Sequence, residues 1–156
     1  MDQFEQAVLN YLCGPPERFV NAQFTIPYAD LKGGSCPDLV VLDFRDKTVY
    51  VVEVTSAADS KAIRGRIVER ETRWFSPIRD HLSKLSVVFQ SWDYHVTIFV
   101  RPEEAGNARE KLHDLLDVSV ISLNDVVFSW QWKWEESRPS NPLREPGKRG
   151  EVHGVE

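Results

Sequence analysis

Two acidic residues, Asp38 and Glu53, each lie in a run of apolar residues that is typical of a buried strand. Residues 38–44 are apolar apart from their acids, and residues 48–55 are rich in Val and contain the single acid Glu53. A carboxylate in such a strand must be paired, protonated or bound to a metal. The short polar connection 45–47 predicts a hairpin, which would bring both acids to one end of a sheet. Two converging carboxylates are the minimum for holding Mg²⁺.

The residues around these acids resemble the signature of the PD-(D/E)xK nucleases, which has Pro-Asp on one strand and Glu-x-Lys on the next. Here Pro37-Asp38 is followed, after fourteen intervening residues, by Glu53-Val54-Thr55. The resemblance implies that Asp38, Glu53 and the carbonyl of Val54 bind Mg²⁺ or Mn²⁺, which would polarise a phosphate and activate a water. It also implies a restriction-endonuclease-like αβββαβ core, in which a central mixed β-sheet is flanked by helices.

Thr55 is the point at which the chain departs from the family, which has lysine there. A threonine hydroxyl is neutral and can only hydrogen-bond. Either another cation supplies the missing charge or the site is catalytically dead. Lys61 and Arg64 lie one to two turns into the next predicted helix, and either side chain could reach back. Because arginine has too high a pKa to act as a base, Lys61 is the better substitute. The expected catalytic residues are therefore Asp38, Glu53 and Lys61.

Arg66, Arg70 and Arg73 form a basic stripe on the same predicted helix, one turn after Arg64. Residues 59–85 contain seven basic and four acidic residues, giving +3, whereas the whole chain carries −5. Two interpretations stay open. The four arginines contact the phosphates of DNA beside the metal site, or they form a solvated face that is partly paired with neighbouring glutamates.

Glu5 is a further candidate at the metal site. In many members of the resembled family a glutamate on the first helix assists there. The favoured interpretation is simpler, because an acid near a helix N-terminus is stabilised by the helix dipole.

The elements that must position these residues follow from hydrophobic periodicity and from proline and glycine breaks. The unbroken apolar runs of the two motif strands indicate a sheet covered on both faces, as in an α/β fold. Helices are predicted over 2–12, over 57–85 with a break at Ser76-Pro77, from Pro102 onward and after residues 122–125. Strands are predicted within 18–27, 38–44, 48–55, 94–100 and 118–121.

The chain of 156 residues is long enough for one domain, which we place at residues 1–136. Residues 137–156 contain three prolines, three glycines and many charges, so we expect a disordered tail. Trp130, Trp132 and Trp134 alternate with polar residues, in conflict with the helical period before them. They either close a core or form a patch for a protein partner or for base stacking.

Composition excludes several classes of protein. A net charge of −5 argues against coating nucleic acid by bulk charge. Two cysteines are too few for a disulfide scaffold and indicate reduced thiols in the cytoplasm. No apolar run approaches the roughly 18 residues that span a bilayer. The sequence leaves homo-oligomerisation open.

Three hypotheses follow. The first is a Mg²⁺- or Mn²⁺-dependent nuclease that hydrolyses DNA phosphodiester bonds. The second is a catalytically degenerate nuclease-fold module that binds a protein or nucleic-acid partner, with Thr55 marking the lost activity. The third is an α/β enzyme or small-molecule-binding domain in which Glu53 is a paired core carboxylate.

Overall fold

The computed structural model describes residues 1–27, 34–55 and 61–127, except for the side chains of residues 61–63 and 127. One helix and five strands come first, followed by a helical crossover and then by strands and helices in alternation. In order they are α1 (Gln3–Leu12), β1 (Arg18–Ala22), β2 (Ile26–Pro27), β3 (Gly34–Ser35), β4 (Leu39–Asp43), β5 (Thr48–Thr55), α2 (Lys61–Val68), the π-helical turn η1 (Glu71–Phe75), α3 (Ser76–Leu85), the 3₁₀ turn η2 (Val87–Ser91), β6 (Asp93–Val100), α4 (Pro102–Leu112), β7 (Val118–Ser122) and α5 (Leu123–Val127).

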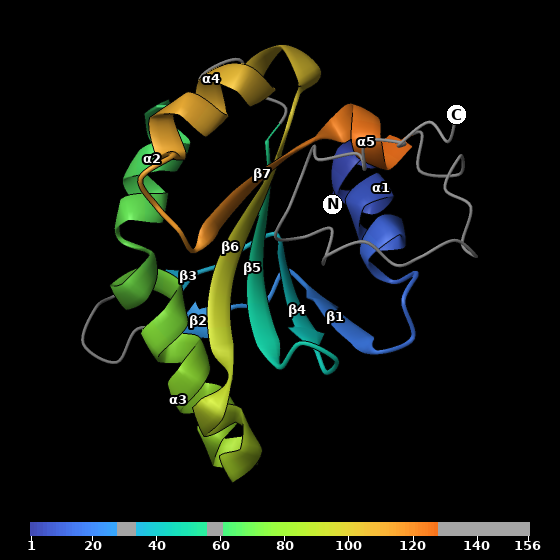
Figure 1. Ribbon diagram of the computed structural model, residues 1–156. Helices are drawn as coiled ribbons and strands as arrows, with labels where there is room; N and C mark the ends of the chain where they lie inside the picture. The colour runs from blue at the N-terminus through green and yellow to red at the C-terminus, as the bar shows by residue number, and fades with distance from the viewer. Residues whose placement is uncertain (28–33, 56–60, 128–156) are drawn as a thin grey trace, which may run out of the picture.

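The centre of the molecule is a five-stranded mixed sheet in the order β1-β4-β5-β6-β7 (Figure 1). β4 runs antiparallel to both β1 and β5, whereas β6 and β7 run parallel to β5. The short strands β2 and β3 form a separate pair. The predicted α/β class, with a mixed sheet flanked by helices, is confirmed.

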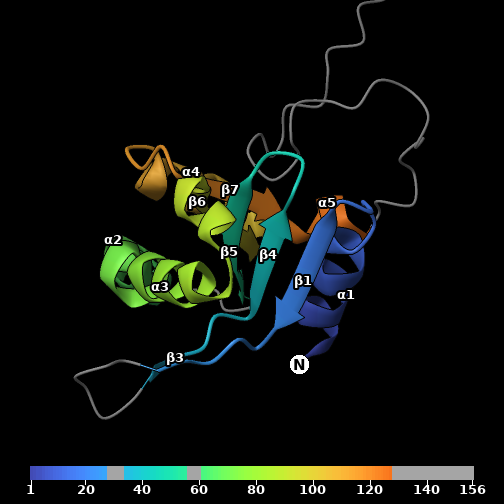
Figure 2. The same cartoon turned by 90° about the horizontal axis from the view of Figure 1, so that it is seen from below.

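Helices cover both faces of this sheet, α1 and α5 on one side and α2, α3 and α4 on the other (Figure 2). Burial on both faces explains why the sequence of β5 does not alternate between apolar and polar residues. Val49 and Val51 pack toward α3, and Tyr50 and Val52 pack toward α1, so both faces of the strand are buried. A strand with apolar neighbours on each side must be apolar at every position, and this makes an acid within it conspicuous.

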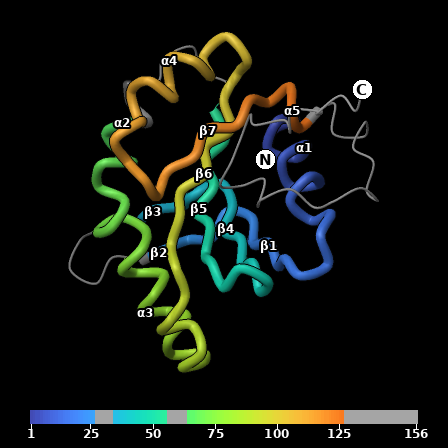
Figure 3. The backbone as a smooth tube through the Cα atoms, viewed as in Figure 1, coloured from blue at the N-terminus to red at the C-terminus, as the bar shows by residue number. Residues whose placement is uncertain are grey.

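The crossover from β5 to β6 differs in one respect from the predicted helix over residues 57–85. Two α-helices, α2 and α3, are joined by the π-helical turn η1, and Figure 3 shows their path along the sheet. Pro77 lies in the first turn of α3, where its missing N–H costs nothing. Just before it, the Ser76 N–H donates to the carbonyl of Glu71, five residues earlier. At the predicted break at Ser76-Pro77, the helix changes from π to α type, while the backbone of Phe75 and Ser76 stays right-handed helical.

The β4–β5 hairpin forms as the sequence predicts. Its turn is closed by Asp43, whose carboxylate accepts the backbone N–H groups of Arg45 and Asp46 at 3.1 and 3.2 Å. Lys47 completes the reversal with a φ of 52°. The helix predicted from Asp2 begins and ends within a residue of its expected bounds, and the helix predicted from Pro102 begins there. The strands predicted over 94–100 and 118–121 also match within a residue.

The Trp130, Trp132 and Trp134 segment and the tail 137–156 lie outside the described residues, so the domain boundary at 136 and the partner surfaces stay predictions. Within the described ranges, none of the helices is both long and apolar enough to span a bilayer. Cys13 and Cys36 are unpaired and exposed.

Candidate functional site

The register of the hairpin brings the two predicted acids together. Leu39 pairs with Val52 in the β4–β5 ladder, and continuing the pairing by one residue places Asp38 opposite Glu53. Asp38 lies just before β4, in the half-buried stretch that follows the buried Pro37. The expectation that strand pairing carries both carboxylates to one end of the sheet is confirmed.

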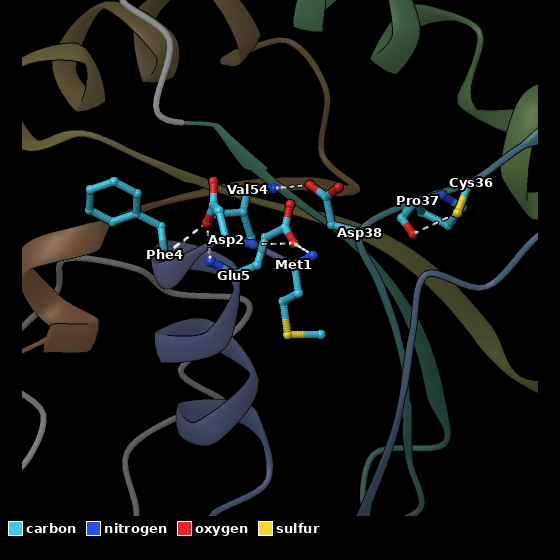
Figure 4. Close-up of polar contacts among 8 residues, drawn as sticks. All are labelled: Met1, Asp2, Phe4, Glu5, Cys36, Pro37, Asp38 and Val54. Carbon is cyan, nitrogen blue, oxygen red and sulfur yellow. Dashed lines mark hydrogen bonds and ion pairs between the residues drawn. The ribbon is translucent and has the colours of Figure 1, made fainter.

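Asp38 is held against the backbone of β5. Its Oδ2 accepts the N–H of Val54 at 2.7 Å (Figure 4). Burial raises the pKa of the Asp38 carboxyl, the Val54 hydrogen bond lowers it, and the nearby charge of Glu5 raises it again. The carboxylate is thus fixed in position while its charge is only partly compensated.

Glu53 is the most constrained acid of the site. Its side chain is 3% exposed, and its Oε2 lies 2.7 Å from Nη1 of Arg66, which is 41% exposed. Burial raises the pKa of Glu53 to about 7, and the charge of Asp38 adds to this rise. The charges of Arg66 and Arg73 act in the opposite direction and lower the pKa. A carboxyl that titrates near neutrality beside a second carboxyl is typical of functional sites.

Glu5 lies near this pair but is engaged elsewhere. Its Oε2 accepts the backbone N–H of Asp2 at 3.1 Å, while Asp2 accepts the N–H of Glu5, so the two residues form a capping box at the start of α1. The first turn of α1 stands beside Asp38 and Val54 (Figure 4). The simpler interpretation of Glu5, as an acid that stabilises the helix N-terminus, is the one that its contacts support.

Among the described side chains, Arg66 makes an ion pair with Glu53, a contact expected of Lys61 or Arg64. Sequence reasoning assigned Arg66 to phosphate contact and did not pair it with Glu53. Lys61 begins α2, but its side chain lies outside the described part, so its catalytic role stays a prediction. Arg64 lines a shallow pocket with Gly65, Val68, Glu69 and Lys111, on a different part of α2.

The other two arginines of the predicted stripe differ from each other. Arg70 holds Asp117 with two bonds, Nε to Oδ2 at 2.6 Å and Nη2 to Oδ1 at 2.7 Å. Its guanidinium is therefore engaged within the protein, and contact with DNA stays a prediction. Arg73 lies 3.8 Å from Glu69 and close enough to Glu53 to lower the pKa of that acid.

Sequence reasoning missed two side-chain pairs. Asp117, the partner of Arg70, is forty-seven residues away along the chain, and no local sequence pattern predicts such a contact. His95 is buried, with its Nε2 2.8 Å from Oγ of Ser119.

The donor set at the acid pair fits a hard divalent cation in kind. Asp38 and Glu53 offer carboxylate oxygens, and Mg²⁺ is commonly bound by one or two carboxylates while it keeps several waters. The described residues contain no cluster of three or more His, Cys, Asp or Glu side chains that could hold a metal. Such a cation would therefore rely on backbone, water or substrate oxygens for its remaining ligands.

Comparison with known proteins returned no match, whether with protein-family models, with curated proteins or with solved structures.

Proposed function

We propose that the protein is a divalent-metal-dependent nuclease that hydrolyses DNA phosphodiester bonds, and that its fold is the restriction-endonuclease-like αβββαβ core. The observation that carries the proposal is the convergence of Asp38 and Glu53 at one end of the β4–β5 hairpin. The element order from α1 through β1, β4 and β5 to the helical crossover and β6 supports it, because this is the order that the resembled family requires.

Asp38 and Glu53 would hold Mg²⁺ or Mn²⁺ together with the carbonyl of Val54. The N–H of Val54 points toward Asp38, and in an extended strand the carbonyl of a residue leaves on the same side as its N–H. A bound divalent cation supplies a nucleophilic water and neutralises developing charge on the phosphate. Glu5 would add to the negative field around the cation through its proximity to Asp38.

The chain's own cations would act on the substrate. Arg66 and Arg73 both lie close enough to Glu53 to lower its pKa, and a guanidinium binds phosphate oxygens well but does not serve as a base. Lys61 is the proposed residue for assisting the attacking water in place of the lysine that Thr55 replaces. Arg64 remains a candidate for phosphate contact farther along the backbone of DNA.

A cleavage assay tests this proposal. Labelled single-stranded, duplex and branched DNA, and RNA, are incubated with Mg²⁺ or Mn²⁺ and the wild-type protein, Asp38→Asn, Glu53→Gln or the exposed control Glu103→Gln. We expect cleavage of DNA that falls roughly 100-fold to 1,000-fold in both site variants, the range seen when charge stabilisation is removed from a transition state. Equal cleavage by all four proteins would locate the activity elsewhere or in a contaminant.

The alternative is a degenerate nuclease-fold module that binds a protein or nucleic-acid partner. The ion pair between Arg66 and Glu53 favours it, because a guanidinium already stands at a predicted metal ligand. The two functions separate in a melting assay with Mn²⁺. A nuclease is stabilised by Mn²⁺ and loses that stabilisation in Glu53→Gln, whereas the degenerate module shows no cleavage and no change in melting temperature.

A further inference from the structure

We propose that Arg66 is a displaceable counter-ion: it bonds Glu53 in the free protein and moves to a phosphate group of the nucleic acid when a divalent cation binds at Glu53. This inference rests on the proposed function, since it presumes the metal site. It adds a coupling between cation binding and phosphate binding that the two carboxylates alone do not require.

The two partners of the ion pair differ in their freedom to move. Glu53 lies in β5, which is hydrogen-bonded to β4 and β6, and its side chain is 3% exposed. Arg66 projects from the surface of α2 and is 41% exposed. The guanidinium can therefore swing into water and find new partners, whereas the carboxylate must stay where the strand holds it.

The charge balance explains why Arg66 does not leave unaided. A buried carboxylate that loses its cation is strongly destabilised, because its charge is then uncompensated. Asp38 stands opposite Glu53 and adds a second negative charge. A divalent cation at these two acids compensates more charge than one guanidinium does. Once it is bound, Glu53 no longer attracts Arg66 strongly.

Arg70, one turn further along, shows what a permanently engaged arginine looks like in this protein. It makes two bonds to Asp117 and a third, from Nη1, to the carbonyl of Ile67 at 3.1 Å. Its side chain is 19% exposed. Among the described contacts, Arg66 has a single ion pair through Nη1. Arg70 thus links the crossover to the start of β7, while Arg66 is the residue that can transfer.

Arginine side-chain NMR tests the displacement directly. The Nε–Hε resonances of Arg66 and Arg70 are assigned in the full-length protein by their loss in Arg66→Lys and Arg70→Lys. Mg²⁺ is then added to millimolar concentration. We expect the Arg66 resonance to shift or broaden as the cation saturates the site, while the Arg70 resonance keeps its position and serves as the internal reference.

The control for site-specific binding is the same titration in Glu53→Gln, which should show no saturable change. If Mg²⁺ raises the melting temperature of the wild type but leaves the Arg66 resonance unmoved, the counter-ion proposal is overturned and the proposed nuclease stands. If Mg²⁺ neither binds nor raises the melting temperature, the proposed metal site is overturned and this inference with it.

A second measurement tests the transfer to phosphate. Binding of a fluorescent DNA oligonucleotide is measured with and without Ca²⁺, for the wild type, Arg66→Met and Arg66→Lys. We expect Ca²⁺ to increase the affinity of the wild type for DNA. The ratio of the affinities with and without Ca²⁺ should be about tenfold smaller in Arg66→Met, the effect of losing one charged contact. Arg66→Lys should recover part of it. An equal gain in all three proteins would overturn the transfer to phosphate.

Discussion

The two ends of the β4–β5 hairpin each contain a buried carboxylate with an arginine partner, but the two sites are built differently. At the turn end, Asp43 is 3% exposed, accepts Nε of Arg18 at 2.9 Å and also accepts two backbone N–H groups. Arg18 is itself only 6% exposed. Each acceptor oxygen of Asp43 therefore has a protein donor, and both charges are enclosed together.

At the open end, Glu53 is buried to the same degree, but its partner Arg66 is 41% exposed and a second acid, Asp38, lies opposite it. The pKa of Glu53 is about 7, because burial outweighs the attraction of Arg66. One end of the hairpin thus has a compensated carboxylate that closes a turn. At the other end, arginine compensates only part of the charge of two neighbouring carboxylates, and such a perturbed pair is typical of functional sites.

The largest expected effect on stability belongs to the compensated end. Asp43→Ala leaves the enclosed Arg18 charge without its partner and removes two turn acceptors, so we expect a loss of about 3–5 kcal/mol in the free energy of unfolding. Urea denaturation measures it. The exposed pair of Arg101 and Glu103, 3.9 Å apart, provides the control, and Glu103→Gln should change stability by less than about 0.5 kcal/mol. A loss as small as the control's would mean that Asp43 is not the structural acid of this comparison.

The second prediction concerns pH and Glu53. Because its pKa is raised from 4.5 to about 7, the folded protein binds this proton more tightly than the unfolded chain does. Stability should therefore fall as pH rises between these values, by about 3 kcal/mol, and stay level above them. Glu53→Gln removes the titrating group. The free energy of unfolding of the variant, relative to that of the wild type, should therefore rise by this amount between pH 4.5 and pH 7.

Urea denaturation of both proteins across this range checks the sign. The raised pKa of Asp38 acts in the same direction in each protein, so only the difference between the two curves reports Glu53. A difference that does not change with pH would show that Arg66 compensates Glu53 as fully as Arg18 compensates Asp43.

The smallest expected effect belongs to the pair of Arg70 and Asp117, which is intermediate between the two ends. Asp117 is 34% exposed, and although partial burial opposes it, the hydrogen bonds and charge of Arg70 lower the pKa of the carboxyl. Its contribution is present above the ordinary pKa of an aspartate and is lost as pH falls through the lowered value. After allowing for screening by solvent, we expect Asp117→Asn to cost about 1 kcal/mol at neutral pH and nothing in strong acid.

Thermal melting at neutral and at strongly acid pH measures the difference, and Asp117→Asn should preserve the proposed nuclease activity. A loss of cleavage that stability does not explain would place Arg70 among the residues that contact DNA, as the sequence pattern suggested.

Local signals in the sequence were sufficient for most of the fold. The apolar runs of β4 and β5, the polar residues between them and the proline at 102 predicted the hairpin and the start of α4. They suffice because hydrophobic periodicity and backbone restrictions act within a few residues. The acids of the site were found for the same reason, since Asp38 and Glu53 stand out within apolar strands.

The partners of those acids were decided only by the tertiary structure. Whether Lys61, Arg64 or Arg66 faces Glu53 depends on where α2 begins and how it is rotated against the sheet, and no spacing along one chain fixes either. The bond between Arg70 and Asp117 joins residues forty-seven positions apart, and it exists because β7 packs beside β6 at the edge of the sheet. The sequence by itself determined which residues could do chemistry here. Packing decided which charge stands opposite which, because long side chains take their partners from the elements that fold against them.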